Sequence, residues 1–300
     1  MQIGMTLPSM VIDGSYSRST TLDWCRLSEA AGFASIACGE RITFGNQEPL
    51  VLLSAAAALT ERVRIFPTVA ILPMHATAWI AKQMATLDVL SNGRLTLSVG
   101  TGGRKHDYRA VGARFEGRNR RMREQIDELR SLWAGQPPFE RAGAVGPRPV
   151  QDPVPLLAGV MGPKSTRRAA EWSDGLCGSV VDCDFDGLPG WVRHAREAWE
   201  EAGRSQPPFL STTCWYALGP DAHATLTRYV HDYMAIFGER PARAMAERQV
   251  VSSPEALHRA CEAAAEAGCD ELILVPASAD RRLLEDTIDS LSARGWLGAD

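Results

Sequence analysis

The chain has 300 residues, of which 45% are hydrophobic and 23% charged, with a formal net charge of -4 at pH 7. This weakly acidic balance argues against nucleic acid and anionic membranes as partners, and no apolar run approaches the roughly 20 residues of a transmembrane helix. The length suits one α/β barrel of about 250 residues with added loops, so we expect a single domain over residues 1–300.

The cysteine pattern also limits the chemistry. There are seven cysteines, and no two have the Cys-x-x-Cys spacing, which argues against a disulfide framework and against a structural zinc site. The first residues lack the basic region followed by an apolar core that marks a secretory signal. We therefore expect a cytoplasmic protein with reduced cysteines, no metal site and no membrane segment.

Strand and helix patterns alternate through the first half of the chain. Short apolar or β-branched runs predict strands at residues 2–7, 34–38, 63–69 and 95–99, and the segments between them predict helices at 20–31, 48–60 and 78–90. A further helix is predicted at 119–133, where Met122, Ile126, Leu129 and Trp133 recur at helical spacing and form one buried stripe. We expect this helix to pack on the outside of a barrel.

The second half continues the alternation after an irregular excursion. Residues 135–155 carry many of the prolines and glycines, and we expect no strand or helix there. Strands are then predicted at 156–158, 175–181, 209–217 and 271–275, with helices at 166–172, 188–202, 254–267 and 281–293 and a mainly helical segment at 221–248. A parallel barrel requires this alternation, so we expect an α/β fold, a (β/α)8 TIM barrel with insertions in the βα loops.

Residues 87–103 close a helix, form the fourth predicted strand and then break into glycines. Asn92 or Gly93 can take the left-handed conformation that ends a helix. Gly100 and Gly102, with Thr101 between them, would let the main chain approach a ligand at the end of the strand. From the residues alone, a ligand-binding loop and a plain tight turn both fit this outline.

A second glycine loop leaves a strand at Gly159 and enters a helix at Pro163. Proline suits the first turn of a helix, and the amides and dipole of that turn favour an anion. Gly159 and Gly162 permit close approach of the main chain, Lys164 supplies positive charge, and Ser165 supplies a hydroxyl donor. The pattern predicts a phosphate site; the alternative is a capped helix with a solvated lysine.

Three side chains at strand ends are candidates for catalysis. Glu40 follows the second predicted strand, His75 the third and His106 the fourth, and the active sites of barrel enzymes lie at the carboxyl ends of their strands. The alternatives are an ion pair between Glu40 and a neighbouring arginine, a structural turn around His75, and a solvated polar loop around His106.

Several stretches match a known family. Between residues 71 and 133 they are Leu72-Pro73-Met74-His75, Ala81-Lys82-Gln83, Leu87-Asp88 to Gly93-Arg94, Val99-Gly100-Thr101-Gly102-Gly103, and Phe115-Glu116-Gly117-Arg118 to Glu124. In these stretches the chain resembles the luciferase-like monooxygenase superfamily, flavin or deazaflavin (F420) oxidoreductases built on a TIM barrel. Segments 27–41, 155–175 and 267–274 resemble that family's second strand, phosphate loop and last strand.

The resemblance implies that FMN or F420 binds at the barrel's active end and carries the redox chemistry. It implies cofactor contacts at Ala70, Ile71, Gly100, Thr101, Gly102, Gly159, Met161, Gly162, Pro163, Lys164 and Ser165. It further implies a non-proline cis peptide near Ala70-Ile71 and a homodimer. The apolar walls of the ring site would come from Met5, Leu7, Ile71 and Trp215.

Arg41 departs from the family pattern, in which a histidine often follows the acidic residue at this strand end. Arginine stays protonated over the physiological range, so a mechanism that uses the histidine as a proton donor does not carry over. Arg41, Arg104 and Arg109 lie near the expected barrel mouth and suit the anionic tail of F420.

We therefore expect an F420- or FMN-dependent oxidoreductase that transfers hydride, or activates oxygen, for a small organic substrate. An FMN-dependent monooxygenase of the luciferase-like type and a non-catalytic flavin-binding barrel are the alternatives. A sugar-phosphate isomerase or aldolase would use the same anion loop, together with either a lysine on an inner strand or a carboxylate and histidine pair. Lys82, Lys105 and Lys164, the only lysines, fall on predicted helices or loops and not on an inner strand.

Overall fold

The computed structural model describes residues 1–180 and 185–298, and its strands form one parallel sheet in the order β3-β2-β1-β9-β8-β7-β6-β5-β4. In the described residues the strands are β1 (Gln2–Thr6), β2 (Ser35–Cys38), β3 (Arg64–Pro67), β4 (Ala70–Ile71), β5 (Leu97–Gly100), β6 (Leu156–Ala158), β7 (Gly175–Cys177), β8 (Phe209–Tyr216) and β9 (Glu271–Pro276).

The strands β3 and β4 are two parts of one barrel strand, interrupted at Thr68 and Val69. β3 pairs with β2, β4 pairs with β5, and a parallel bridge between Ile65 and Leu95 joins β3 to the chain just before β5. The sheet thus closes on itself, which confirms the predicted (β/α)8 barrel. The Thr68–Val69 peptide bond is cis, so the cis bond expected near Ala70-Ile71 was placed wrongly and lies slightly earlier in the chain.

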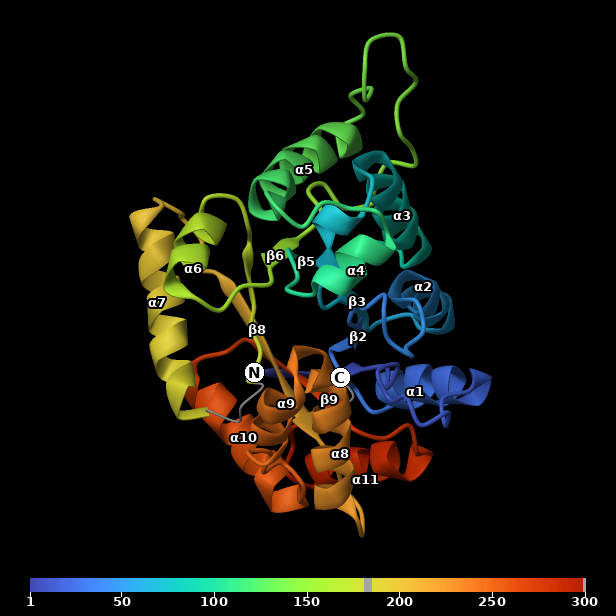
Figure 1. The fold of residues 1–300 in the computed structure, drawn as a ribbon, viewed down its shortest axis with the longest axis vertical. Helices are drawn as coiled ribbons and strands as arrows, with labels where there is room; N and C mark the ends of the chain where they lie inside the picture. The colour runs from blue at the N-terminus through green and yellow to red at the C-terminus, as the bar shows by residue number, and fades with distance from the viewer. Residues whose placement is uncertain (181–184, 299–300) are drawn as a thin grey trace.

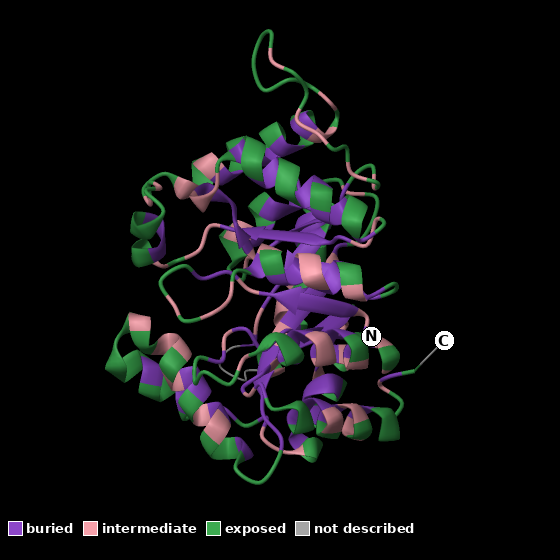
Figure 2. Cartoon of the chain, turned by 90° about the vertical axis from the view of Figure 1, so that its right-hand side faces the viewer, coloured by how far each residue is buried: buried purple, intermediate pink, exposed green. Residues whose placement is uncertain are grey.

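Helices surround the strands on all sides (Figure 1). In the described residues they are α1 (Arg18–Ala30), α2 (Pro49–Leu59), α3 (Thr77–Leu90), α4 (Lys105–Ala110), α5 (Arg118–Trp133), α6 (Pro163–Ala170), α7 (Leu188–Glu201), α8 (Ala222–Met234), α9 (Glu239–Ala246), α10 (Pro254–Ala267) and α11 (Arg281–Ala293), with short 3-10 turns at Leu72–Met74, Phe185–Gly187 and Ala235–Phe237. The strands are buried, whereas the helices turn their exposed faces outward (Figure 2). None of the described helices is long and apolar enough to cross a membrane.

Helix boundaries follow local chemistry. The Glu48 carboxylate accepts a hydrogen bond from the Val51 amide at 2.6 Å and caps the start of α2. After α3, Asn92 and Gly93 have φ values of 54° and 78°, so both residues take the left-handed conformation that turns the chain toward β5. Gly268, with a φ of 89°, ends α10 in the same way.

Two charged side chains, Asp88 in α3 and Arg94 just after it, fix neighbouring segments of the chain to one another. Asp88 is fully buried; its Oδ2 accepts hydrogen bonds from the Val150 and Gln151 amides at 2.7 and 2.9 Å, and its Oδ1 accepts one from the Gln151 side chain at 2.7 Å. The Arg94 guanidinium donates to three carbonyl oxygens between the end of α2 and the start of β3, at 2.6–2.9 Å. Asp88 thereby fastens the end of the 135–155 excursion to α3.

The excursion itself contains no helix or strand, as predicted, and projects from the barrel beyond α3 and α5 (Figure 1). By contrast, residues 105–110 were expected as a polar loop and form the short helix α4. Tertiary contacts explain the difference, because Asp107 accepts hydrogen bonds from Thr43 and Tyr108 packs edge-on against Phe115 with ring centroids 5.2 Å apart. The strand expected at 175–181 ends at Cys177, and residues 181–184 lie outside the described residues.

Side chains fill the inside of the barrel. Ala37, Phe66, Leu157, Cys177 and Ile273 form a buried cluster there, 0–6% exposed, against which Val69 packs. The six described cysteines are free and buried, consistent with their expected role in the core. Because the interior is packed, a ligand can bind at a mouth of the barrel and not inside it.

Candidate functional site

The two glycine loops lie side by side at the carboxyl ends of β5 and β6. These strands pair in parallel with Val99 opposite Ala158, and the residues that follow are Gly100 and Gly159. A Cβ atom on Gly100 would lie 2.9 Å from Val69 Cγ2, and one on Gly159 would lie 2.6 Å from Val69 Cγ1. A side chain at either position would therefore force Val69 to move, because Val69 occupies the space of the missing side chains.

A cavity of about 360 Å³, the central cavity, opens at this end of the barrel. Its walls include Leu7 after β1, Val69, Gly159, and Trp215 from β8, and α8 contributes Tyr229 and Tyr233. Leu7 and Trp215 were expected as ring walls. Met5 and Ile71 were also expected, but neither lines this cavity: Met5 is fully buried, and Ile71 packs behind Gly102.

A second hollow of about 450 Å³ adjoins the central cavity, and we call it the arginine hollow. It lies between the ends of β5 and β6, the start of α5 and the length of α6, and Arg120, Arg123 and Arg168 line it. Gly159 and Met161 line both spaces. The two volumes lie in the range of ordinary small-molecule sites, and together they offer a mainly apolar compartment next to one lined by three arginines. Two of these arginines, Arg120 and Arg123, form ion pairs with Glu124 and Glu171.

The structure brings only part of the predicted cofactor-binding set to these spaces. Gly100, Thr101, Gly159, Met161 and Ser165 line the arginine hollow. The remaining predicted residues lie elsewhere. Ala70 and Ile71 are buried in β4, and Gly102 packs against Ile71. Gly162, Pro163 and Lys164 are exposed at the start of α6. The lysine expected to meet a phosphate is thus exposed and does not line the hollow.

The arginines of α5 and α6 were missed by sequence reasoning. The stripe of apolar residues in α5 predicted its buried face correctly, and Met122, Ile126 and Leu129 are buried. The same stripe says nothing about where the first turn lies relative to the strand ends. The available signal was the run Arg118 to Arg123, in which four of six residues are arginine.

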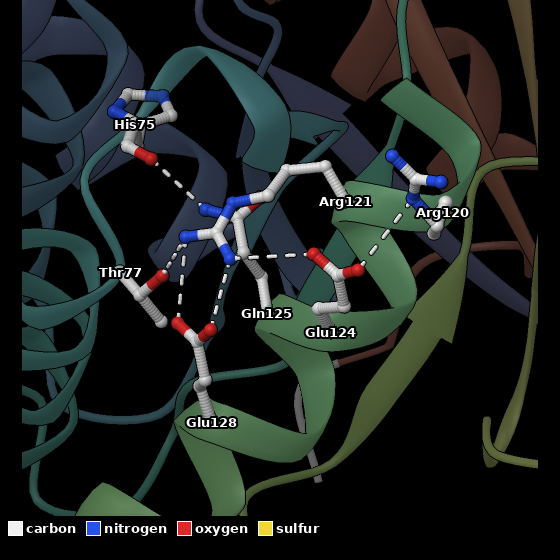
Figure 3. A network of polar contacts seen from close by, with 7 residues as sticks. All are labelled: His75, Thr77, Arg120, Arg121, Glu124, Gln125 and Glu128. Atoms are coloured by element: carbon white, nitrogen blue, oxygen red, sulfur yellow. Dashed lines mark hydrogen bonds and ion pairs between the residues drawn. The ribbon is translucent and has the colours of Figure 1, made fainter. Parts of the chain in front are cut away.

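A network of polar contacts fixes the start of α5 beside the chain that follows β4 (Figure 3). Arg121 donates to Thr77 Oγ1 at 2.7 Å and forms an ion pair with Glu128 at 2.9 Å. Gln125 Nε2 donates to the carbonyl oxygen of His75 at 2.9 Å. These contacts hold the first turns of α5 at the rim, where their arginines reach the arginine hollow.

Glu40 and His75 form a hydrogen-bonded pair, with 2.7 Å between Oε1 and Nε2. The other Glu40 oxygen accepts the Ile71 amide at 2.6 Å. Burial by itself lowers the pKa of His75, but the hydrogen bond and charge of Glu40 outweigh it, and the pKa of His75 is raised above 6.5. The protonated imidazole is therefore favoured beside the carboxylate.

This pair does not line the central cavity. Glu40 and His75 surround a separate hollow of about 10 Å³, and Val69 lines both that hollow and the central cavity. Glu40 thus braces the main chain of β4 behind Val69. His106, the third candidate, is exposed on α4 and lines neither the central cavity nor the arginine hollow, because the residues that α4 buries are Asp107 and Tyr108.

Comparisons with known proteins agree with this architecture. An uncharacterised protein of Mycobacterium tuberculosis is 32% identical over 169 residues, which cover 54% of this chain and 59% of that protein. A solved F420-dependent secondary alcohol dehydrogenase, in complex with an F420-acetone adduct, superimposes with a TM-score of 0.78 at 20% identity, covering 97% of this chain and 98% of its own.

A second solved structure is the oxygenating constituent of 3,6-diketocamphane monooxygenase from Pseudomonas putida in complex with FMN. Its TM-score is 0.72 at 18% identity, with 97% of this chain and 96% of that chain covered. These neighbours share the barrel fold, and one is described with F420 and the other with FMN. The family described as luciferase-like monooxygenase matches residues 1–275, and the chain therefore belongs to the luciferase-like monooxygenase family.

Proposed function

We propose that the protein is an F420- or FMN-dependent oxidoreductase that acts on a small organic substrate. The tricyclic ring would occupy the central cavity, and the phosphate of the cofactor would occupy the arginine hollow. The observation that carries this proposal is the junction of the two spaces at Gly159 and Met161. A ligand with a flat apolar ring and an anionic tail matches an apolar cavity that opens onto three arginines.

The paired glycine loops at the ends of β5 and β6 fit such a ligand. Gly100 and Gly159 leave room that Val69 fills, and the side chain of Val69 faces the central cavity. When bound, the cofactor supplies hydride transfer or, as a reduced flavin, oxygen activation. Val69 and Leu7 would support one face of the ring, while Tyr229 and Tyr233 would border the space left for substrate.

The described residues that line the central cavity include no histidine and no carboxylate. Besides the guanidinium of Arg104, the groups there that can hold a proton are hydroxyls and a thiol, such as Ser179, Thr213, Tyr229 and Cys177. Burial raises the pKa of Tyr229 above its ordinary value, so its hydroxyl stays protonated and can donate a hydrogen bond. We propose that Tyr229 and its neighbours orient the substrate for hydride transfer at the ring.

A titration of the purified protein with FMN and with F420 tests the assignment. Riboflavin, and the deazaflavin riboside without its phosphate tail, are the matched controls. The proposal predicts saturable binding of one phosphorylated cofactor, about hundredfold tighter than its dephosphorylated form, because several charged hydrogen bonds are lost with the phosphate. Binding of neither cofactor, or equal binding of the dephosphorylated form, would overturn it.

A non-catalytic flavin-binding barrel is the second candidate. It is favoured by the position of Glu40 and His75 outside the central cavity. Cofactor binding without reduction of any electron acceptor, and without oxidation of alcohols or ketones, would support this second function over the first.

We also propose that the chain works as a homodimer in the cytoplasm. The outer surface of the barrel exposes Val51 on α2 and Trp79 on α3, at 70% and 67% of their full surface. Large apolar side chains of this kind favour a protein contact. Sedimentation equilibrium of the wild type and of Trp79→Glu tests the proposal: a dimer that the substitution dissociates supports it, and a monomeric wild type contradicts it.

A further inference from the structure

Two guanidinium groups lie near each other at the edge of the central cavity, Arg41 after β2 and Arg104 just before α4. The Arg41 Cζ lies 3.8 Å from the ring centroid of Phe44 and 5.0 Å from that of Tyr233. The Arg104 Cζ lies 5.1 Å from the Tyr233 centroid and 5.7 Å from that of Phe237. Both cations therefore rest on the ring of Tyr233.

In the described part of the chain these cations have no carboxylate partner. Arg41 is only 4% exposed; its Nη1 donates to the carbonyl oxygen of Tyr233 at 3.0 Å, and its Nε is buried without a hydrogen-bond partner. The Nε of Arg104 is also buried and unpartnered. Within residues 1–180 and 185–298 neither arginine forms an ion pair, and Asp107, which acts on both at longer range, is hydrogen-bonded to Thr43.

Such an arrangement is unfavourable without a ligand. Burial and then the charge of Arg104 lower the pKa of Arg41 to about 10, yet Arg41 remains protonated at neutral pH. The aromatic faces offset part of the cost, but a buried cation is normally paired. An anion that entered beside the two guanidinium groups would relieve both the desolvation and the repulsion between the like charges.

We propose that Arg104, supported by Arg41, binds the carboxylate of the organic substrate. This inference rests on the proposed oxidoreductase function and adds the substrate class, an apolar carboxylic acid. Arg104 lines the central cavity and would contact the carboxylate directly; Arg41 does not line it and acts as a positioning residue through Tyr233. The apolar body of the acid would lie among Trp215, Tyr229 and other apolar wall residues.

The position of this pair separates it from the cofactor tail. Neither Arg41 nor Arg104 lines the arginine hollow, and Arg120, Arg123 and Arg168 do not line the central cavity. A ring bound between the two groups would have its phosphate on one side and a substrate carboxylate on the other. Guanidinium groups suit this role because their planar donors match a carboxylate in two-point contact.

Calorimetric titration with phenylacetate and with its neutral amide, phenylacetamide, tests the proposal with and without bound cofactor. The wild type should bind the acid about tenfold to hundredfold more tightly than the amide, the range set by one charged hydrogen bond. Arg104→Met should abolish this preference, whereas Arg104→Lys should keep part of it. Arg109→Met, an exposed arginine on α4, is the control and should leave the preference intact.

The role of Arg41 is tested by charge rescue. Arg41→Met should lower the preference for the acid, and Arg41→Lys should restore most of it, whereas a purely structural role would make both variants equally weak. Circular dichroism melts identify variants that fail to fold. Equal binding of acid and amide by the wild type would overturn the proposal, as would an Arg104→Met variant that loses cofactor affinity and keeps its preference for the acid.

The proposed oxidoreductase function and the proposed carboxylate site can be refuted independently of each other. The proposed function fails if neither FMN nor F420 binds the wild type. The carboxylate preference is measured on the cofactor-free protein as well, so it stands or falls on its own result.

Discussion

Replacing Gly159 with alanine tests whether the cofactor ring rests against Val69. The added Cβ would lie 2.6 Å from Val69 Cγ1 and 3.3 Å from the carbonyl oxygen of Val99. Valine is stiff at χ1, and Val69 lines the central cavity, so it can make room by moving toward that cavity. In the cofactor-free protein that space is open, and we expect a modest change in the free energy of unfolding.

A bound ring would remove that freedom. Overpacking of a filled site costs about 1–3 kcal/mol, so the substitution should weaken cofactor binding about 5- to 150-fold. Fluorescence titration of FMN and F420 measures the effect. Gly103→Ala is the matched control, because no atom lies within 4 Å of its added Cβ, and it should bind like the wild type.

A compensating change strengthens the test. In the double variant Gly159→Ala, Val69→Ala, the clash is gone, and affinity should recover relative to Gly159→Ala, with the coupling expected of residues in contact. If Gly159→Ala binds cofactor as tightly as the wild type, the ring does not rest against Val69 and the reasoning is refuted.

Three further variants test the phosphate site, the Glu40–His75 pair and the contacts of Asp88. Arg168→Ala should weaken binding of the phosphorylated cofactor about tenfold and leave its dephosphorylated form unaffected; Arg167→Ala, which removes only an exposed ion pair with Glu201, is the control, and equal effects would contradict the phosphate site. Because Glu40 raises the pKa of His75 above 6.5, protonated His75 stabilises the fold, fully below about pH 6.5 and no longer once the pH exceeds the raised pKa. Urea unfolding should therefore show a stability difference between the wild type and Glu40→Gln that shrinks as the pH rises from 6 to 9, and a constant difference would contradict the pairing. Asp88→Ala should lower the free energy of unfolding by roughly 1–3 kcal/mol, since buried amides lose their acceptor; exposed Asp127→Ala should change it little, and an unaffected Asp88 variant would show that the excursion is not held there.

The barrel could be predicted from local pattern because each element carries its own signal. The stripe of Met122, Ile126 and Leu129 identifies the buried face of α5, and the glycines at 100 and 159 mark strand ends that pair as expected. The family model over residues 1–275 and the closed parallel sheet confirmed the family and the (β/α)8 fold.

The site was harder to predict because it depends on contacts between distant residues. Glu40 and His75 both follow strand ends, yet Val69 lies between them and the central cavity. Lys164 sits in the predicted phosphate loop but is exposed, whereas Arg123, from a helix expected to lie outside the barrel, reaches the hollow. Such differences arise from the direction of a side chain at a helix start, which periodicity does not encode.

The most direct test is a crystal structure of the protein with FMN or F420 bound. We expect the ring to lie against Val69 in the central cavity, with the phosphate in the arginine hollow beside Arg168 and Ser165. A phosphate found beside Arg41 and Arg104, or a ring bound away from the paired glycine loops, would contradict it.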